Sequence, residues 1–176
     1  MKKIVAMSLL AGIMFFALGA KKAFSLSSTT FKDGSPIPKK CALNAAKGQN
    51  VSPQLNWSNL PVGTKSFAIS CIDTNPVARR WVHWMLINIP PTATEIPEGG
   101  SLPGKTLALE NSFKQVGYGG PNPPKGTGIH KYVFTIYALN TPALEVKAKF
   151  LSKAGLESLI KGKTLGKASL TGTYIK

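Results

Sequence analysis

The feature that most constrains this chain is the stretch at residues 117–132, GYGGPNPPKGTGIHKY, which holds five glycines and three prolines. Proline removes a backbone N–H donor and fixes φ, and glycine permits positive φ, so the stretch cannot form a helix. It runs directly into YVFTIYAL at residues 132–139, whose β-branched and aromatic side chains are typical of a strand. A stiff loop of this kind can align backbone N–H groups around an anion. The sequence therefore predicts either a ligand-binding loop ahead of a buried strand or a long surface turn without a ligand.

Short apolar runs bounded by proline and glycine recur along the rest of the chain and predict strands. The strongest are residues 65–72, a nearly continuous apolar run, and residues 80–89, which end at a proline pair. By period two, one face of the second run would carry Trp81, His83, Met85 and Ile87, and the other Val82, Trp84, Leu86 and Asn88. We also expect an edge strand and a turn within residues 25–38, a strand at 40–46, a turn-rich segment at 92–109 and a closing strand at 167–175.

A single helix is predicted near the C-terminus. Ser152 is a suitable N-cap, and Gly162 would end the helix. Leu156, Leu159 and Ile160 recur between them at helical spacing. Many short strands, one helix and frequent turns indicate a mainly β fold, which we expect to be a two-sheet β-sandwich with one short C-terminal helix.

The first residues have the pattern of a secretory signal peptide. Lys2 and Lys3 precede an uncharged apolar stretch at residues 4–20, and a Ser/Thr-rich segment follows Lys21 and Lys22. We expect a signal peptide at residues 1–20, a short tail at 21–28, one domain at 29–176, and a periplasmic or secreted protein. An uncleaved N-terminal anchor is the alternative, because the apolar stretch is barely long enough to span a membrane.

A net charge of +15, from 22 basic and 7 acidic residues, favours anionic partners. The lysines are spread along the chain, the only arginines are Arg79 and Arg80, and no nucleic-acid motif is present. We therefore interpret the charge mostly as a solvated basic surface with a modest bias towards anions. The partners we expect are a small anionic or phosphorylated ligand and an anionic membrane surface, but no nucleic acid.

Cys41 and Cys71 are the only cysteines of the chain. In an oxidising compartment they could form one disulfide, which would close a loop of about 30 residues and add about 3 kcal/mol in the chain-entropy model. Two separate buried thiols are the alternative. Two cysteines and two histidines at these spacings do not predict a zinc site.

Polar residues with binding chemistry fall at predicted strand ends: Asp73, His83 and the stretch at residues 117–132. Two imidazoles, a phenol and a row of backbone N–H groups suit a phosphate or a carboxylate. Asp73 could hold one histidine in a fixed tautomer by accepting a hydrogen bond from a ring N–H. Each residue also has a structural interpretation, since a lone histidine on a strand is often a core residue and an aspartate at a strand end often caps a turn.

Several longer motifs occur in order along the chain: SPQLNW (52–57), DTNP (73–76), WVHW (81–84), NIP (88–90), YGGPNPPKGTGIHKY (118–132) and the closing ASLTGTY (168–174). Together they resemble the phosphatidylethanolamine-binding protein family, and more narrowly its bacterial Raf-kinase-inhibitor-like branch. The resemblance covers residues from about 29 to 176 and lacks the extra C-terminal helix of animal members.

The resemblance implies a β-sandwich with a small, open pocket for phosphate, phosphoryl headgroups, acetate or similar anions. Two positions depart from the family pattern: Asn75 replaces the second aspartate of an Asp-Pro-Asp-x-Pro signature, and Asn122 replaces a glycine that precedes the proline pair in animal relatives. The first change removes a negative charge near the mouth, and the second alters the inner wall. The ligand-binding residues implied by the resemblance are Asp73, Trp81, His83, Gly120, Asn122, Pro123, Pro124, His130 and Tyr132.

We expect an exported protein that binds a small anion or a phosphoryl headgroup, with no catalytic residues, no cofactor and no metal. An inhibitor or interaction module for a protease or another protein is the alternative. A hydrolase that uses Asp73 and the two histidines is a third hypothesis. It is disfavoured because the sequence has no nucleophile elbow, metal-ligand spacing or phosphate-transfer motif.

Overall fold

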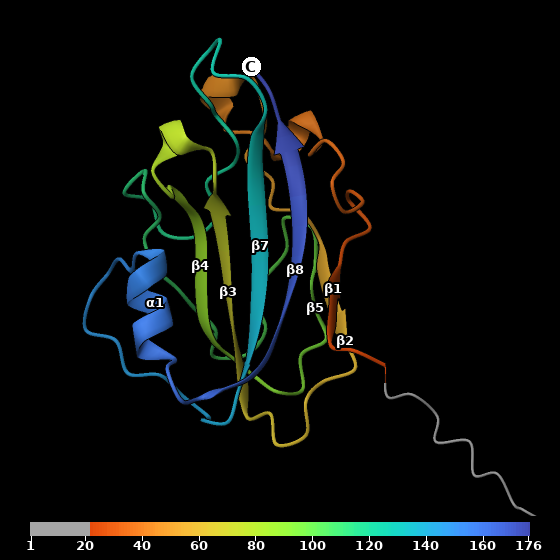
Figure 1. Ribbon diagram of the computed structural model, residues 1–176, viewed down its shortest axis with the longest axis vertical. Helices are drawn as coiled ribbons and strands as arrows, with labels where there is room; N and C mark the ends of the chain where they lie inside the picture. The colour runs from red at the N-terminus through yellow and green to blue at the C-terminus, as the bar shows by residue number, and fades with distance from the viewer. Residues whose placement is uncertain (1–21) are drawn as a thin grey trace, which may run out of the picture.

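The computed structural model describes residues 22–176, and the predicted signal peptide at residues 1–20 lies outside them. Two β-sheets form the body of the protein, with one α-helix beside the larger sheet (Figure 1). This arrangement confirms the predicted mainly β, two-sheet fold with one short C-terminal helix. The elements, in chain order, are β1 (Ser25–Ser27), the 3-10 helices η1 (Lys39–Cys41) and η2 (Asn44–Ala46), β2 (Leu55–Ser58), β3 (Ser66–Asp73), the 3-10 helix η3 (Pro76–Ala78), β4 (Val82–Ile89), β5 (Glu95–Ile96), β6 (Leu107–Ala108), β7 (His130–Leu139), α1 (Lys153–Leu159) and β8 (Thr164–Tyr174).

The larger sheet has five strands in the order β6–β4–β3–β7–β8, and the smaller has three in the order β1–β2–β5. Every neighbouring pair of strands is antiparallel. β7 lies between β3 and β8, and it pairs with β8 from His130 opposite Tyr174 to Leu139 opposite Thr164. The stretch at residues 117–129, which we call the glycine–proline loop, therefore leads into an interior strand of the larger sheet.

The larger sheet is covered by apolar layers on both faces. Phe67 and Cys71 of β3 pack in the layer between the sheets, together with Trp57 of β2. Ala68 of β3 belongs to a second layer, which includes Leu156 of α1. All eight residues of β3 are buried, which explains why its sequence is a nearly continuous apolar run.

A β-bulge interrupts the pairing of β4 with β3 near the start of β4. Ile72 pairs with Val82 and Cys71 pairs with Trp84, so His83 is an extra residue on β4. Such bulges redirect a side chain and are common beside binding sites. The predicted faces of residues 80–89 are therefore wrong at this end, because Val82 packs in the layer under α1 whereas Trp84 faces the smaller sheet.

The segment at residues 40–46, predicted as a strand, instead contains η1 and η2. Its N–H groups bond locally or to a distant loop: Cys41 donates to the carbonyl of Pro38, and Leu43 donates to the carbonyl of Pro121. These tertiary hydrogen bonds outweigh a weak local preference for a strand.

The possible disulfide is not formed, since Cys41 and Cys71 are both free and buried. Cys41 ends η1, Cys71 lies within β3, and both side chains pack in the layer between the sheets. Each thiol behaves there as a small apolar side chain. The structure thus shows the alternative of two separate buried thiols.

The ends of the described chain follow the predictions closely. Ser152 caps α1, because its Oγ accepts a hydrogen bond from the N–H of Gly155 at 3.0 Å. At the other end β1 forms an edge of the smaller sheet, inside the segment predicted to hold an edge strand. Within residues 22–176, no helix has both the length and the apolar character needed to cross a bilayer.

Candidate ligand-binding site

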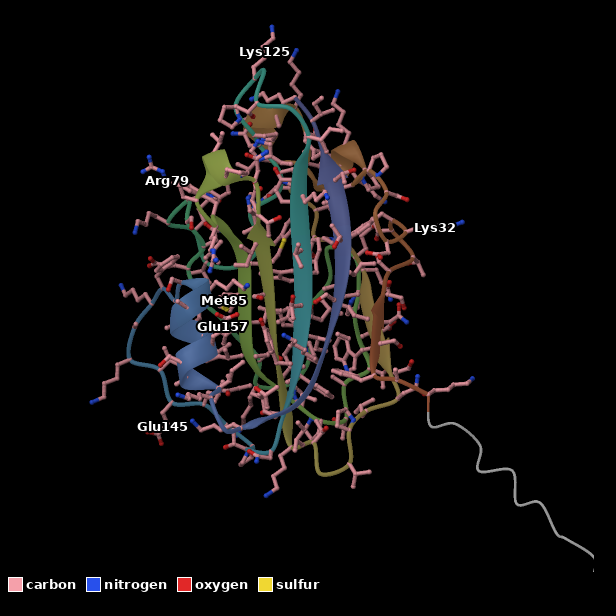
Figure 2. The ribbon with its side chains drawn as sticks, in the orientation of Figure 1. Lys32, Arg79, Met85, Lys125, Glu145 and Glu157 are labelled. Carbon is pink, nitrogen blue, oxygen red and sulfur yellow. The ribbon has the colours of Figure 1, made fainter. Side chains whose placement is uncertain are left out.

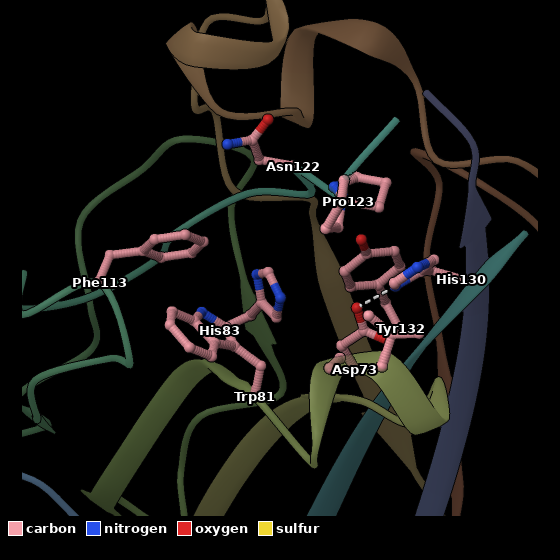
Figure 3. A pocket seen from close by; sticks show the side chains of 11 residues that line it. Asp73, Trp81, His83, Phe113, Asn122, Pro123, His130 and Tyr132 are labelled. Atoms are coloured by element: carbon pink, nitrogen blue, oxygen red, sulfur yellow. Dashed lines mark hydrogen bonds and ion pairs between the residues drawn. The ribbon is translucent and has the colours of Figure 1, made fainter. Parts of the chain in front are cut away.

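A pocket lies at the end of the larger sheet where β3 ends and where β4 and β7 begin (Figure 3). Its volume is about 200 Å³. The lining residues are Asp73, Val77, Ala78, Trp81, His83, Phe113, Asn122, Pro123, Pro124, His130 and Tyr132. The structure therefore brings together all the predicted ligand-binding residues except Gly120.

His83 is buried in the pocket wall with 3% of its surface exposed. Its Nδ1 lies 2.6 Å from the carbonyl oxygen of Gly119. A carbonyl oxygen only accepts, so Nδ1 carries the hydrogen and the neutral ring presents a lone pair at Nε2. Burial lowers the pKa of His83 to about 4, although the nearby Gly119 carbonyl acts in the opposite direction, so the ring is neutral at pH 7.

His130 forms hydrogen bonds from both ring nitrogens. Its Nδ1 lies 2.5 Å from Oδ2 of Asp73, and its Nε2 lies 2.8 Å from the hydroxyl of Thr127. That hydroxyl lies 2.7 Å from the carbonyl oxygen of Pro124, which can only accept, so the single hydroxyl hydrogen goes to Pro124. Both ring nitrogens of His130 are therefore occupied by hydrogen bonds. His130 and Asp73 form a buried ion pair.

Asn75 connects this pair to the mouth of the pocket. Its backbone N–H donates to Oδ1 of Asp73 at 2.9 Å, and its side-chain oxygen caps η3 by accepting from the N–H of Val77. Its amide nitrogen also donates to the carbonyl oxygen of Ile129 at 3.3 Å. An ionised aspartate in place of Asn75 could still cap η3, but it could not make this last bond. The departure from the family signature thus adds a hydrogen bond between η3 and the glycine–proline loop.

Tyr132 lines the pocket, and its hydroxyl is buried without a hydrogen-bond partner in the described part of the chain. Burial, with a further contribution from the charge of Asp73, raises the pKa of Tyr132 well above its usual value. The hydroxyl therefore remains a donor. Buried donors are nearly always satisfied in native proteins, so this one indicates a place for a water molecule or a ligand.

Gly120 is absent from the residues that line the pocket, although its backbone acts on the ring of His83. A Cβ at this position would lie 2.0 Å from the carbonyl oxygen of Cys41, so only glycine fits against η1. The N–H of Gly120 donates to Oδ1 of Asn50 at 2.7 Å, and the hydroxyl of Tyr118 donates to the Cys41 carbonyl at 3.1 Å. Gly120 therefore holds the glycine–proline loop against the segment at residues 41–50.

Exposed apolar side chains lie at the mouth of the pocket, and basic side chains occupy the same end of the molecule. Trp81 is 40% exposed and Val77 is 58% exposed. The Nζ of Lys176 donates to Oδ1 of Asn122 at 2.8 Å, which places the C-terminal residue against the pocket wall. Lys125 and Arg79 project from the same end of the molecule (Figure 2). This rim would favour the approach of an anion.

The sequence did not predict that Phe113, Val77 and Ala78 line the pocket. Phe113 is positioned by Asn111, a fully buried residue whose side chain accepts from the N–H of Phe113 at 2.8 Å and donates to the carbonyl of Gly117 at 3.0 Å. The only sequence signal for this arrangement was a turn-forming asparagine ahead of an aromatic residue. Val77 and Ala78 belong to η3, whose side chains carry no distinctive chemistry.

The pocket offers hydrogen-bonding groups of several kinds: a neutral imidazole, a buried ion pair and a phenol. These groups suit a small polar ligand. In the range 22–176, no group of three or more histidine, cysteine, aspartate or glutamate side chains is placed to hold a metal ion.

Fold and site together define a β-sandwich protein with a small pocket at one end of its larger sheet. The family model described as "Phosphatidylethanolamine-binding protein" matches residues 27–175. The chain belongs to the phosphatidylethanolamine-binding protein family.

Bacterial relatives support this assignment over most of their length. The UPF0098 protein YbcL of Escherichia coli K12 is 34% identical over 183 residues, which cover 99% of this chain and 98% of YbcL. The UPF0098 protein YbhB of the same organism is 36% identical over 129 residues, covering 69% of this chain and 81% of YbhB. These relatives confirm the bacterial YbhB/YbcL-type branch.

Solved structures of other proteins support the same family assignment. The crystal structure of E. coli YbcL, described as a member of the mammalian PEBP family, superimposes with a TM-score of 0.79 at 33% identity and covers 87% of this chain and 98% of YbcL. The PEBP homolog CT736 of Chlamydia trachomatis gives a TM-score of 0.76 at 31% identity, with 88% and 98% coverage.

Proposed function

We propose that this protein is an exported binding protein that holds a small anionic or phosphorylated ligand in the pocket. The proposal rests on one observation: His83, the Asp73–His130 pair and the unpartnered hydroxyl of Tyr132 border a single cavity of about 200 Å³. Sites for drug-sized ligands are larger, about 300–1,000 Å³. A cavity of this size suits one phosphate, one carboxylate or a short headgroup.

Charge supports the same ligand class. The chain carries a net charge of +15, and Lys125 and Arg79 lie at the end of the molecule that holds the pocket (Figure 2). A basic rim raises the local concentration of anions and speeds their association. The interior of the pocket then supplies hydrogen bonds that fix the orientation of the ligand.

Thermal unfolding with added anions tests the proposal. A ligand that binds only the native state stabilises it by about 2.7 kcal/mol at 100 times its Kd, so phosphate, O-phosphoethanolamine or acetate should raise Tm in a dose-dependent way. His83→Ala and Tyr132→Phe should reduce the shift. Lys65→Ala, directly before β3 and at the opposite end of that strand from Asp73, is the matched control and should respond like the wild type.

Two outcomes would contradict the pocket assignment: no tested anion shifts Tm, or His83→Ala and Tyr132→Phe shift as much as the wild type. An inhibitor of a protease or another protein remains the alternative function. Capture of a protein partner that survives both pocket substitutions would favour that alternative.

Export is the part of this proposal that depends on residues 1–20. We expect the protein in the periplasmic or secreted fraction with a mature N-terminus near Lys21. Cell fractionation followed by N-terminal sequencing tests this, and an unprocessed cytoplasmic chain would contradict it.

A further inference from the structure

We propose that the pocket selects an oxyanion that still carries a proton, such as a phosphomonoester monoanion, over oxyanions that have no acidic hydrogen, such as sulfate or a phosphodiester. This inference rests on the proposed anion-binding function and names the ligand class more narrowly. It follows from the direction of each hydrogen bond in the pocket wall.

His83 presents an acceptor to the ligand. Its Nδ1–H is committed to the carbonyl of Gly119 at 2.6 Å, which leaves the lone pair on Nε2. Nε2 makes no hydrogen bond within residues 22–176, and the ring lines the cavity. A fully ionised oxyanion would place its own lone pairs against this nitrogen, whereas a P–O–H group would donate to it.

The groups that face His83 add no free positive charge. Asp73 from β3 and His130 from β7 pair with each other at 2.5 Å, and both ring nitrogens of His130 are already bonded. Tyr132 from β7, whose ring centroid lies 4.9 Å from that of His83, is neutral. The loop on the other side supplies the ring of Phe113 and the backbone carbonyls of Gly119 and Gly120. Charge attraction therefore comes from the basic residues at this end of the molecule. The interior of the pocket distinguishes ligands by whether they can donate a hydrogen bond to His83.

One hydrogen bond is enough to distinguish an oxyanion that carries a proton from one that does not. A site whose buried acceptor is left unpaired loses the hydrogen bond and also bears the desolvation of that acceptor. Rejection of an analogue that lacks the required O–H can then reach about 10⁴–10⁵, as in enzymes that recognise a hydroxyl. This open pocket should show at least a tenfold preference.

Proton uptake should accompany binding at high pH. A phosphomonoester loses its second proton with a pKa of about 6, so below that value the ligand brings its own proton. Above it, the complex must take a proton from solvent, shared between the ligand and Nε2 of His83. Linkage then requires the Kd to rise about tenfold for each pH unit above about 6.5.

Isothermal titration calorimetry of the purified protein tests the inference with methyl phosphate, dimethyl phosphate and sulfate. At pH 5.5, methyl phosphate and dimethyl phosphate are both monoanions, but only the first has an acidic hydrogen. We expect methyl phosphate to bind at least tenfold more tightly than either of the others. Repeating the titration at pH 8 in buffers of different ionisation enthalpy should show uptake of about one proton.

His83→Asn is the informative variant. Its amide nitrogen can take the place of Nδ1 and donate to Gly119, while the acceptor at Nε2 is lost. The preference for methyl phosphate over sulfate should fall towards one, and the pH dependence of the Kd should flatten. If the variant does not fold, the titrations of the wild type with methyl phosphate, dimethyl phosphate and sulfate test the proton selectivity by themselves.

Lipid and free sources of the phosphomonoester are distinguished by two further probes. O-phosphoethanolamine in solution should compete with methyl phosphate, and vesicles containing phosphatidic acid, a monoester lipid, should compete if the membrane can reach the pocket. Vesicles of phosphatidylethanolamine, a phosphodiester, should not compete. Competition by this phosphodiester as strong as that by phosphatidic acid would overturn the inference.

The remaining outcomes separate the inference from the proposed function. Sulfate or dimethyl phosphate binding as tightly as methyl phosphate, without proton uptake at pH 8, would overturn the proton selectivity and leave the anion pocket intact. Failure of every anion to bind would refute the proposed function, and the inference with it.

Discussion

Nδ1 of His130 lies 2.5 Å from Oδ2 of Asp73, although 57 residues separate them in the chain, and neither side chain exposes more than 4% of its surface. The contact joins the end of β3 to the start of β7. One ion pair thus supports both the sheet and the pocket wall.

Replacing Asp73 by alanine should destabilise the fold strongly. Removal of one partner leaves a buried charge uncompensated, which costs about 3–5 kcal/mol. Urea unfolding would measure the loss. Glu157→Ala is the matched control: its i,i+4 pair with Lys153 at 3.4 Å is largely exposed, so the change should stay below about 0.5 kcal/mol. Equal effects of the two substitutions would contradict a buried charged pair.

Stability should fall as the pH is lowered from about 6.5 to about 4, because burial lowers the pKa of His83 from 6.5 to about 4. In this window the unfolded chain binds a proton that the folded protein does not. Above the window the ring is neutral in both states, and below it the ring is protonated in both. The difference between the two pKa values corresponds to about 3 kcal/mol.

Unfolding in urea at several pH values, in buffers without phosphate, would detect this loss. His83→Asn does not titrate and can keep a donor to Gly119, so it isolates the contribution of the ring. The free energy of unfolding of the wild type relative to the variant should decline as the pH falls through the window. A constant difference would mean that His83 does not titrate differently in the two states.

Gly120→Ala should be far more harmful than Gly126→Ala. The new Cβ at position 120 would meet the Cys41 carbonyl oxygen at 2.0 Å, so the backbone must shift, at a cost of about 3 kcal/mol. Gly126 has φ of +81° with nothing within 4 Å of an added Cβ, so alanine there costs only the left-handed strain, about 1–2 kcal/mol. Thermal unfolding of the two variants checks the order, and equal losses would show that the loop does not pack against η1.

Both thiols should be inert in the native protein. Burial raises the pKa of Cys41 to about 11 and that of Cys71 well above its usual value, so little thiolate is present. Ellman's reagent at pH 8 should label neither cysteine in the folded state and both in denaturant. Absence of labelling in denaturant without reductant would instead reveal a disulfide.

Much of the fold could be predicted because its signals are local. The continuous apolar run of β3 and the N-cap at Ser152 each depend on neighbouring residues. The glycine–proline stretch, taken with Asp73 and His83, also predicted the place of the pocket. That these three features lie together in one pocket was predicted from the family pattern, since spacing alone does not show which strands are adjacent.

The errors arose where distant contacts decide the local structure. The bulge at His83 breaks the alternation that the predicted faces of β4 assumed, because the loop at residues 112–119 bonds to both sides of it: Ser112 N–H to Val82 and Gly119 N–H to His83. Residues 40–46 form 3-10 helices because Leu43 bonds to Pro121, far along the chain. The sequence also did not show that the missing side chain of Gly120, a predicted ligand-binding residue, makes room for Cys41.

The hydrogen bond between Lys176 and Asn122 also bears on how the protein can be handled. The chain ends beside the pocket, whereas its first described residues leave from the other end of the molecule (Figure 1). An affinity tag or reporter fused after Lys176 would hang over the mouth, and a polyhistidine tag would bring additional imidazoles within reach of the ligand. Such a fusion would compete with the ligand being assayed, so a purification handle belongs at the N-terminus of the mature chain, near Lys21, or behind a cleavable linker.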